Sequence, residues 1–409
     1  MRTAPVPRVD AIIVGAGIAG LACAHRLNDA DVRFLIVTED VGGRMVRSRD
    51  GTVSLGAYYV RADYHHVNRY VDRGRQINRL VIRRHDERGS YGFWDPRLFL
   101  HLPQAVRYLR LLRRFRTHYH AFTDKCLTMS QASALRSDPF LLELYELPAS
   151  SLVGQLGIEE LACAYLDPVC NGTTFLPLRR LPAFTVLLGS LPLLVPIYEF
   201  SPSWDALLGG IGHAIRTGSV TRVDRFDDGF RLTTRTGETF MATNVVLATP
   251  IEVSRNLLEM PKAKGAVAVH MFEVAGRFQK KLRSGDLHLF GRENPFHAIV
   301  SHPDDLFVVC SPLEHPPFDE AFEQWELLEH RYWNPAFNLD GSTLLECEQA
   351  PNLFLVGDHN ICGLEDAYLT GHHAANQIVE RSRHRSSTTL DRYAEDASGV
   401  VAIGRPAPT

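Results

Sequence analysis

The sequence predicts an α/β protein in which a Rossmann-like dinucleotide-binding domain is interleaved with a second domain of α+β type. Three observations support this fold class: a glycine-rich strand-turn-helix signature at the start of the chain, a buried-strand run followed by Gly357-Asp358 near its end, and a length of 409 residues, which exceeds the usual size of one domain. Because the two signatures lie far apart, we expect the dinucleotide-binding domain to be discontinuous.

The first signature consists of three glycines between a strand signal over 11–14 and a helix-like run over 21–27. They are Gly15, Gly17 and Gly20. In this order the first glycine permits a tight turn, the second lets the backbone approach a pyrophosphate, and the third lets the helix pack on the strand. The helix N-terminus then faces the phosphates, so the segment indicates dinucleotide binding rather than a purely structural turn.

A second strand, 33–37, ends at Thr38-Glu39-Asp40. Rossmann-like folds place a carboxylate at the adenosine ribose, about 20 residues after the glycines. Glu39 is the natural candidate, whereas an ungapped count from Gly15 favours Thr38. Both side chains accept a hydrogen bond from a hydroxyl, but only a carboxylate accepts with full charge assistance. We therefore expect Glu39 at the ribose and keep Thr38 as the alternative.

Gly42-Gly43-Arg44 comes next, and here the chain resembles the flavin amine oxidase and phytoene desaturase superfamily, which also contains protoporphyrinogen oxidases. In that family a Gly-Gly-Arg lines the phosphates and ribityl chain of FAD, and a segment of small residues follows beneath the flavin ring. Gly56-Ala57 matches that segment. The resemblance therefore implies FAD as the cofactor, held by a Rossmann-like domain of the glutathione-reductase type.

The resemblance extends to the last signature. In the family an aspartate in the position of Asp358 holds a ribityl hydroxyl, and the next helix points its N-terminus at the flavin N1 and C2 carbonyl, where its dipole favours negative charge. A valine near Val220 touches adenine in the family, although a strand valine is usually only core. The cofactor-binding residues implied for this part of the chain are Val220, Gly357, Asp358, Leu364, Glu365 and Asp366.

Composition excludes several other classes of protein. A formal net charge of -3 argues against a nucleic-acid partner. Seven scattered cysteines without a CxxC pair indicate a reducing cytoplasm, and the opening residues contain no apolar segment typical of a signal peptide. Histidine pairs such as His65-His66 and His372-His373 do not share a helix face, so we expect no metal site.

These signatures imply domain boundaries. We expect an FAD-binding domain of residues 1–60, 205–265 and 340–383, a substrate domain of residues 61–204 and 266–339, and a flexible tail of residues 384–409.

Two stretches of the expected substrate domain carry a pattern. Residues 104–118 read as a helix with Arg107, Arg110 and Arg114 on one side. Such a helix can lie on an anionic membrane surface, which would give a cytoplasmic protein a peripheral membrane contact, and the alternative is a solvated face over a core face. Residues 181–197 are strongly apolar but interrupted by prolines, so they fit the lining of a substrate tunnel or a buried core better than a membrane span.

Three residues are catalytic candidates: His270, Tyr58 and Trp333. Amine oxidases of the family commonly carry a lysine near flavin N5, and aligning 265–272 with that strand places His270 at this position. A histidine there can act as a general base, and the alternative is a histidine on the outer face of a strand. Gly363 stands where the family has the second aromatic wall of an amine cage, which argues against a simple primary-amine oxidase.

The leading functional hypothesis is an FAD-dependent oxidoreductase that oxidises, by desaturation, a largely apolar small molecule through hydride transfer to flavin N5. An amine or amino-acid oxidase that releases peroxide is the first alternative. The others are a flavin-dependent double-bond isomerase with no net redox change and a non-catalytic FAD-binding protein.

Overall fold

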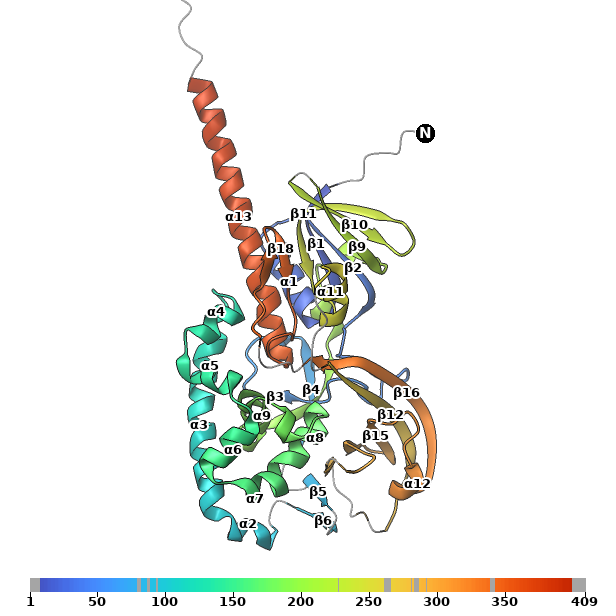
Figure 1. The fold of residues 1–409 in the computed structure, drawn as a ribbon. Coiled ribbons are helices and arrows are strands. Elements are labelled where there is room, and N and C mark those ends of the chain that lie inside the picture. The colour runs from blue at the N-terminus through green and yellow to red at the C-terminus, as the bar shows by residue number, and fades with distance from the viewer. Residues whose placement is uncertain are drawn as a thin grey trace, which may run out of the picture.

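The described part of the protein contains three β-sheets and a group of helices (Figure 1). The structure is a computed structural model, and it describes residues 8–398 except 79–81, 87–88, 93–94, 227, 261–265, 281, 283–286, 292 and 339–342.

The largest sheet has eight strands and carries the glycine-rich signature. Its main path is β17 (Glu348–Ala350), β18 (Leu353–Leu355), β11 (Thr239–Leu247), β1 (Arg8–Ala16), β2 (Phe34–Val41) and β8 (Ile215–Thr217). A hairpin of β9 (Val220–Phe226) and β10 (Gly229–Thr234) pairs with β11. The pairs β1–β11, β1–β2 and β11–β18 are parallel, and strands buried on both faces account for the unbroken apolar run at 11–14.

Two helices cross on one face of this sheet, α1 (Ile18–Asn28) and the long α13 (Leu364–Ser398) (Figure 1). They approach closely because Gly371 presents no side chain where α13 meets α1. A Cβ atom at Gly371 would overlap the backbone carbonyl of Ala19. The helix α13 continues into the segment 384–409 that was expected to be a flexible tail, and residues 399–409 lie outside the described residues.

The crossing of α1 and α13 can be tested with Gly371→Ala. Because the new methyl group would overlap backbone rather than a movable side chain, we expect a loss of about 3 kcal/mol in the free energy of unfolding, measured with urea. Gly189→Ala is the matched control, since Gly189 lies in helix α9 (Ala183–Ser190) with open space at its Cβ position. That variant should be neutral or slightly more stable. Equal effects at the two positions would contradict this account of the helix crossing.

The second sheet has seven strands and is drawn from two distant parts of the chain. Its order is β16 (Phe322–Asn338), β12 (Ala266–Phe278), β15 (Leu306–Ser311), β14 (Ala298–Ser301), β13 (Leu287–Phe290), β5 (Ile82–Asp86) and β6 (Gly89–Tyr91). A third, small sheet contains β3 (Val60–Arg61), β7 (Ile197–Pro202) and β4 (Val71–Gln76).

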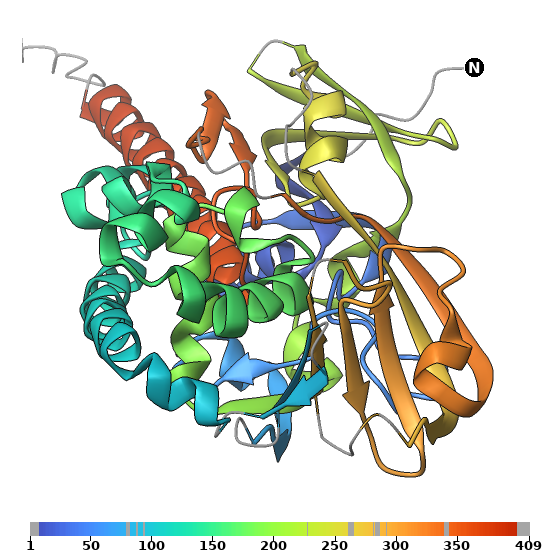
Figure 2. The ribbon, with the colours of Figure 1, turned by 60° about the horizontal axis from the view of Figure 1, so that its bottom comes forward.

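Helices face the seven-stranded sheet across the molecule (Figure 2). They are α2 (Pro96–Leu100), α3 (Leu102–Lys125), α4 (Gln131–Arg136), α5 (Pro139–Glu146), α6 (Ala149–Leu156), α7 (Glu159–Leu161), a π-helical turn (Ala162–Leu166), α8 (Asp167–Thr174) and α9. The remaining helices are α10 (Trp204–Leu208), α11 (Ile251–Leu257) and α12 (Phe318–Ala321). Among the helices that the structure describes, none combines the length and apolar character needed to cross a membrane.

The main hydrophobic core joins these layers. It combines side chains of α1 and α13 with those of α3, α9 and one face of the seven-stranded sheet, which we call the inner face. The predicted fold class, a Rossmann-like domain interleaved with an α+β domain, is confirmed. The residue boundaries proposed for the two domains stay a prediction.

Candidate cofactor and active site

Two glycine turns meet in front of helix α1. Gly15 has φ +103°, and a Cβ atom there would lie 2.7 Å from the carbonyl oxygen of Ala248. Gly43 has φ +58°, and a Cβ atom there would lie 3.0 Å from the Cα of Gly17, the residue that precedes α1. The first turn of α1 carries no acidic side chain, so its backbone N–H groups can serve an anion. The arrangement fits the pyrophosphate of a dinucleotide.

Glu39 and Thr38, the two ribose candidates, lie in different environments at the end of β2. The hydroxyl of Thr38 is buried and accepts a hydrogen bond from the Ala16 N–H at 3.2 Å, so it holds the end of β2 against the end of β1. Glu39 is exposed, and its carboxylate lies 3.5 Å from the guanidinium of Arg235. Val220 begins β9 and is buried in the smaller core beside the ends of these strands. These placements leave Glu39 as the accessible candidate for the ribose.

The Gly-Gly-Arg turn is tied to the last signature by a bidentate ion pair. Both terminal nitrogens of Arg44 donate to the carboxylate of Asp358, each at 2.6 Å, and one of them also donates to the Ala336 carbonyl at 2.6 Å. Burial alone would raise the pKa of Asp358, but the adjacent Arg44 guanidinium outweighs burial and holds this pKa below its usual value. Sequence reasoning assigned both residues to FAD separately, whereas the structure brings them together.

Glu365, a predicted cofactor-binding residue in the first turn of α13, makes structural hydrogen bonds. The carboxylate of Glu365 accepts the backbone N–H groups of His65, His66 and Val67 at 2.8 to 2.9 Å, so it fastens the turn after β3 to α13. Leu364, the first residue of α13, is partly buried against the main core. The preceding Gly357 donates its N–H to the Thr370 hydroxyl at 2.8 Å, which positions the turn that carries Asp358.

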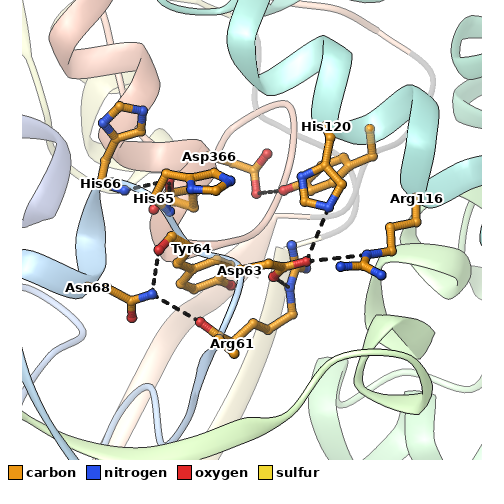
Figure 3. A network of polar contacts seen from close by, with 12 residues as sticks. Arg61, Asp63, Tyr64, His65, His66, Asn68, Arg116, His120 and Asp366 are labelled. Carbon is orange, nitrogen blue, oxygen red and sulfur yellow. Dashed lines mark hydrogen bonds and ion pairs between the residues drawn. The ribbon is translucent and has the colours of Figure 1, made fainter.

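Asp366 belongs to a buried polar network that sequence reasoning missed (Figure 3). Its carboxylate accepts a hydrogen bond from the hydroxyl of Tyr119, in α3, at 2.8 Å, while its other oxygen has no hydrogen-bond partner among the described residues. Burial raises the pKa of Asp366 to about 7. Arg61 stacks over Tyr119 and pairs with Asp63 at 2.9 Å, and Arg116 lies 3.8 Å from the same carboxylate. The network connects the first turn of α13 to the helical layer.

Two of the three catalytic candidates lie beside the small-residue segment. The indole N–H of Trp333 donates to the Leu55 carbonyl at 2.7 Å, and the backbone N–H of Ala57 donates to the Arg44 carbonyl at 2.8 Å. Gly56 is required there, because a Cβ atom would overlap the same Arg44 carbonyl. The hydroxyl of Tyr58 is buried without a hydrogen-bond partner among the described residues. Tyr58 thus offers the site a phenol that a ligand can engage.

His270 lies on the opposite side of its strand from this segment. Its neighbours Val269 and Met271 project into the main core, so alternation along β12 turns His270 to the outer face. There its ring hydrogen-bonds His330 at 2.9 Å and stacks on the exposed Tyr332. The structure therefore does not bring this candidate base together with the cofactor cradle, by which we mean the Gly15 and Gly42-Gly43 turns and the Arg44–Asp358 pair.

The apolar stretch 181–197 forms α9 and a 3₁₀ turn and then leads into β7. Four of its residues line a cavity of about 260 Å³ together with the end of β4. The lining consists of Gln76, Ile77, Asn78, Pro192, Val195, Pro196 and Ile197. A continuous tunnel from this cavity to the cradle stays a prediction.

Comparisons with known proteins agree with the geometry. The family model described as an NAD(P)-binding Rossmann-like domain matches residues 13–73. No curated protein sequence matches the chain. The fold is similar to that of wild-type putrescine oxidase bound to putrescine, with 13% identity, a TM-score of 0.62, and coverage of 92% of this chain and 100% of that one.

Two further solved structures extend the comparison. Cyclohexylamine oxidase from Brevibacterium oxydans IH-35A has 14% identity and a TM-score of 0.62, and a protein assigned by inference as a protoporphyrinogen oxidase, from Exiguobacterium sp. 255-15, has 16% identity and a TM-score of 0.61. Each match covers 92% of this chain and 100% of the other. At these identities the likeness establishes a shared fold, and it confirms the resemblance seen in the sequence at the level of the fold.

Proposed function

We propose that the protein is an FAD-dependent oxidoreductase that oxidises a largely apolar small molecule. The observation that carries the proposal is the cradle itself, in which the Gly15 turn and the Gly42-Gly43 turn meet in front of α1 and the Arg44–Asp358 pair ties the second turn to the segment after β18. The shared fold of the oxidases described above supports it. When bound, FAD accepts a hydride at N5.

The residues around the cradle favour an apolar substrate. Much of the inner face of the seven-stranded sheet is apolar and belongs to the same core as Leu55 and Val356 of the cradle segments. Its apolar members include Val267, Val269, Met271, Leu287, Leu289, Ala298, Val300, Val308 and Cys310. Such a surface excludes water from a bound substrate and strengthens the electrostatic interactions nearby. Tyr58 holds its proton at this face, because burial raises the pKa of its phenol well above the usual value.

A second candidate function is amine oxidation. Two of the similar structures are those of putrescine oxidase, solved with putrescine bound, and cyclohexylamine oxidase. Against it stands Gly363, where a Cβ atom would lie 2.5 Å from the carboxylate of Asp366, so an aromatic wall has no room there without displacement of Asp366.

An anaerobic titration separates these functions. The purified protein is mixed with an apolar polyene, an amine or an amino acid, its flavin absorbance is followed, and air is then admitted. Bleaching by the polyene supports the proposal, and recovery with peroxide in air identifies an oxidase. Bleaching by an amine or amino acid alone would replace the proposal with the second candidate. No bleaching by any class would remove the support for net oxidation and favour an isomerase.

We also propose that the corner formed by α2 and α3 contacts an anionic membrane. This corner exposes Phe99 (66%), Leu100 (79%) and Leu102 (54%), and residues 96–123 contain six arginines and no acidic side chain. The arrangement suits insertion of apolar side chains with arginine at the lipid headgroups. Carboxylates oppose it locally, because Asp95 directly precedes α2 and Glu160 of α7 lies 3.3 Å from His101.

A vesicle sedimentation assay tests the membrane proposal. Replacing Phe99 and Leu100 with serine should reduce binding to phosphatidylserine vesicles by about tenfold or more, because two large apolar side chains no longer insert. Salt should weaken the binding of the unaltered protein. Replacing Leu327 and Leu328 with serine is the matched control, since these exposed residues lie on β16. Unchanged binding of the first variant would exclude this corner.

A further inference from the structure

A buried cation lies in the substrate part of the protein, away from the cradle. Arg84, in β5, is 3% exposed. Its Nε and Nη1 atoms have no hydrogen-bond partner among the described residues, and none of the described carboxylates forms an ion pair with it. A guanidinium stays charged at neutral pH, and a buried charge ordinarily has both an ion partner and hydrogen bonds. Arg84 therefore has unused capacity to bind an anion.

Two tyrosines frame this guanidinium. The Arg84 guanidinium lies 5.3 Å from the ring centre of Tyr165, and Tyr91, its cross-strand neighbour on β6, completes the frame. Tyr165 belongs to the π-helical turn Ala162–Leu166, whose Ala164 carbonyl accepts the Tyr91 hydroxyl at 2.5 Å. Single π-helical turns occur frequently at functional sites. The rings contribute a cation–π interaction, but they leave the in-plane N–H donors of Arg84 unused.

Arg84 shares the inner face of the sheet with the candidate active site. Successive cross-strand neighbours form one row across five strands: Met271, Cys310, Ala298, Leu289 and Arg84. Directly opposed residues project from the same face of a sheet. The start of the row adjoins Tyr58, whose pKa is raised by burial and by the neighbouring Tyr59 and Cys310. Three strand spacings separate Cys310 from Arg84, a distance of about 14 Å.

We propose that Arg84 is the anion subsite of the substrate and binds a carboxylate carried by an elongated apolar body. This inference rests on the proposed function and specifies its substrate class. A carboxylate can accept charge-assisted hydrogen bonds from the guanidinium N–H groups that have no partner among the described residues. A carboxylate carries one negative charge, which matches the single buried positive charge of Arg84. A phosphate carries more charge, so moving it from water into this apolar surrounding costs more free energy.

The length of the row sets the length of the ligand. A molecule that places its carboxylate at Arg84 and its reacting carbon near Tyr58 must reach along this row, in which the backbone positions of Cys310 and Arg84 are about 14 Å apart at an inter-strand spacing of about 4.8 Å. Leu289 and Ala298 line the interval with apolar groups. Helix α8 covers Leu289 closely, because a Cβ atom at Gly172 would overlap the Leu289 side chain. The ligand therefore requires α8 to yield, and binding should be slower than for an open groove.

Thermal unfolding with a matched pair of probes tests the subsite. Retinoate and retinol share an elongated polyene body, and only retinoate carries a carboxylate. We expect retinoate to raise the unfolding midpoint of the unaltered protein and retinol to raise it less. Arg84→Met should weaken retinoate binding by about tenfold or more, the effect of losing hydrogen bonds to a charged group, and leave retinol binding unchanged. Equal effects of the two probes on the unaltered protein would overturn the subsite.

The ligand-free variants give an independent readout. Because Arg84 lacks an ion partner, Arg84→Met should unfold at the same or a higher temperature than the unaltered protein. Arg84→Lys keeps the charge and loses the planar fork, so it should bind retinoate more weakly and gain no stability. A structural role for Arg84 predicts the opposite, with a lowered midpoint in Arg84→Met and unchanged retinoate binding in Arg84→Lys. Either result would overturn the proposal.

Failure of the subsite and failure of the proposed function are distinguishable. The unfolding measurement needs no electron transfer, so retinoate can stabilise the protein without bleaching its flavin. That outcome retains the subsite as a carboxylate-binding site and rejects oxidation of this probe. Bleaching by retinol and retinoate alike, with no dependence on Arg84, retains the oxidoreductase and rejects the subsite.

Discussion

Replacing Asp358 with alanine is expected to lower the free energy of unfolding by about 3 kcal/mol and to release FAD from the purified protein. The carboxylate of Asp358 accepts two hydrogen bonds of 2.6 Å from Arg44, and both side chains are at least two-thirds buried. Removing one member of such a pair leaves the other charge without its partner. The variant also loses the group that we expect to hold a ribityl hydroxyl.

The control for Asp358→Ala is another bidentate pair in the same protein. The carboxylate of Glu348 accepts two hydrogen bonds from Arg381, at 2.6 and 2.7 Å, on β17 and α13. These side chains are about one-third exposed and lie outside the cradle. Glu348→Ala should therefore lose about 1 kcal/mol or less and keep its flavin. Flavin occupancy after gel filtration and unfolding in urea are the measurements, and full occupancy in Asp358→Ala would exclude Asp358 from the cofactor site.

The effect of Asp358→Ala should depend on pH in a definite direction. Since the pKa of Asp358 is lowered in the folded protein, its ionised form contributes stability above the pKa of an ordinary aspartate. That contribution is lost as the pH falls through the lowered pKa. The difference in unfolding free energy between the unaltered protein and Asp358→Ala should therefore shrink in acid.

The cofactor cradle was predictable because it depends on local backbone conformation. Gly15 and Gly43 adopt positive φ values and lie against backbone atoms, so only glycine fits at these positions. A glycine there in the sequence therefore indicates the turn. Gly357 also has a positive φ, +134°, although its Cβ position is open space. Positions of this kind recur at fixed spacing in a motif, which is why two short segments were enough to predict the fold class.

His270 lies on the outer face of its strand, which is the alternative to a role as general base. Val267, Val269 and Met271 alternate as core residues, so the residues between them face outward. The position of this strand in the chain favours a site near the flavin, whereas its alternation favours the outer face for His270, and the structure agrees with the alternation.

The polar pairs of the site could not be predicted, because each joins distant parts of the chain. Arg44 with Asp358 and Tyr119 with Asp366 are separated by 314 and 247 residues. Such contacts depend on how α3, α13 and the sheets pack, and neither local propensity nor spacing encodes that packing. The burial of Arg84 could not be predicted either, since its guanidinium is buried only when the sheet and the π-helical turn come together.

Replacing Asp366 with asparagine is expected to stabilise the protein near neutral pH and to have little effect in acid. Burial raises the pKa of Asp366 from 3.8 to about 7, and hydrogen bonding to Tyr119 and the charge of Arg61 only partly offset burial. The unfolded chain therefore ionises at lower pH than the folded protein, and the stability of the unaltered protein falls as the pH rises from near 4 to near 7. Over this pH range the free energy of unfolding of the unaltered protein should fall by about 4 kcal/mol.

Asparagine cannot ionise, yet it keeps an oxygen that accepts the Tyr119 hydroxyl, so Asp366→Asn should not lose this stability. The ionisable groups that act on Asp366, or on which it acts, are Arg61, Tyr64, Tyr119, Glu365, Cys126 and Cys362. They are present in both proteins, so the difference in unfolding free energy between variant and unaltered protein isolates residue 366. Urea unfolding at pH 5 and pH 8 measures it. Tyr119→Phe should raise the pKa of Asp366 further, because the lost hydrogen bond favours the ionised carboxylate. A difference between Asp366→Asn and the unaltered protein that does not change with pH would mean that Asp366 is ionised in the folded protein, and that the first turn of α13 carries a negative charge toward the flavin.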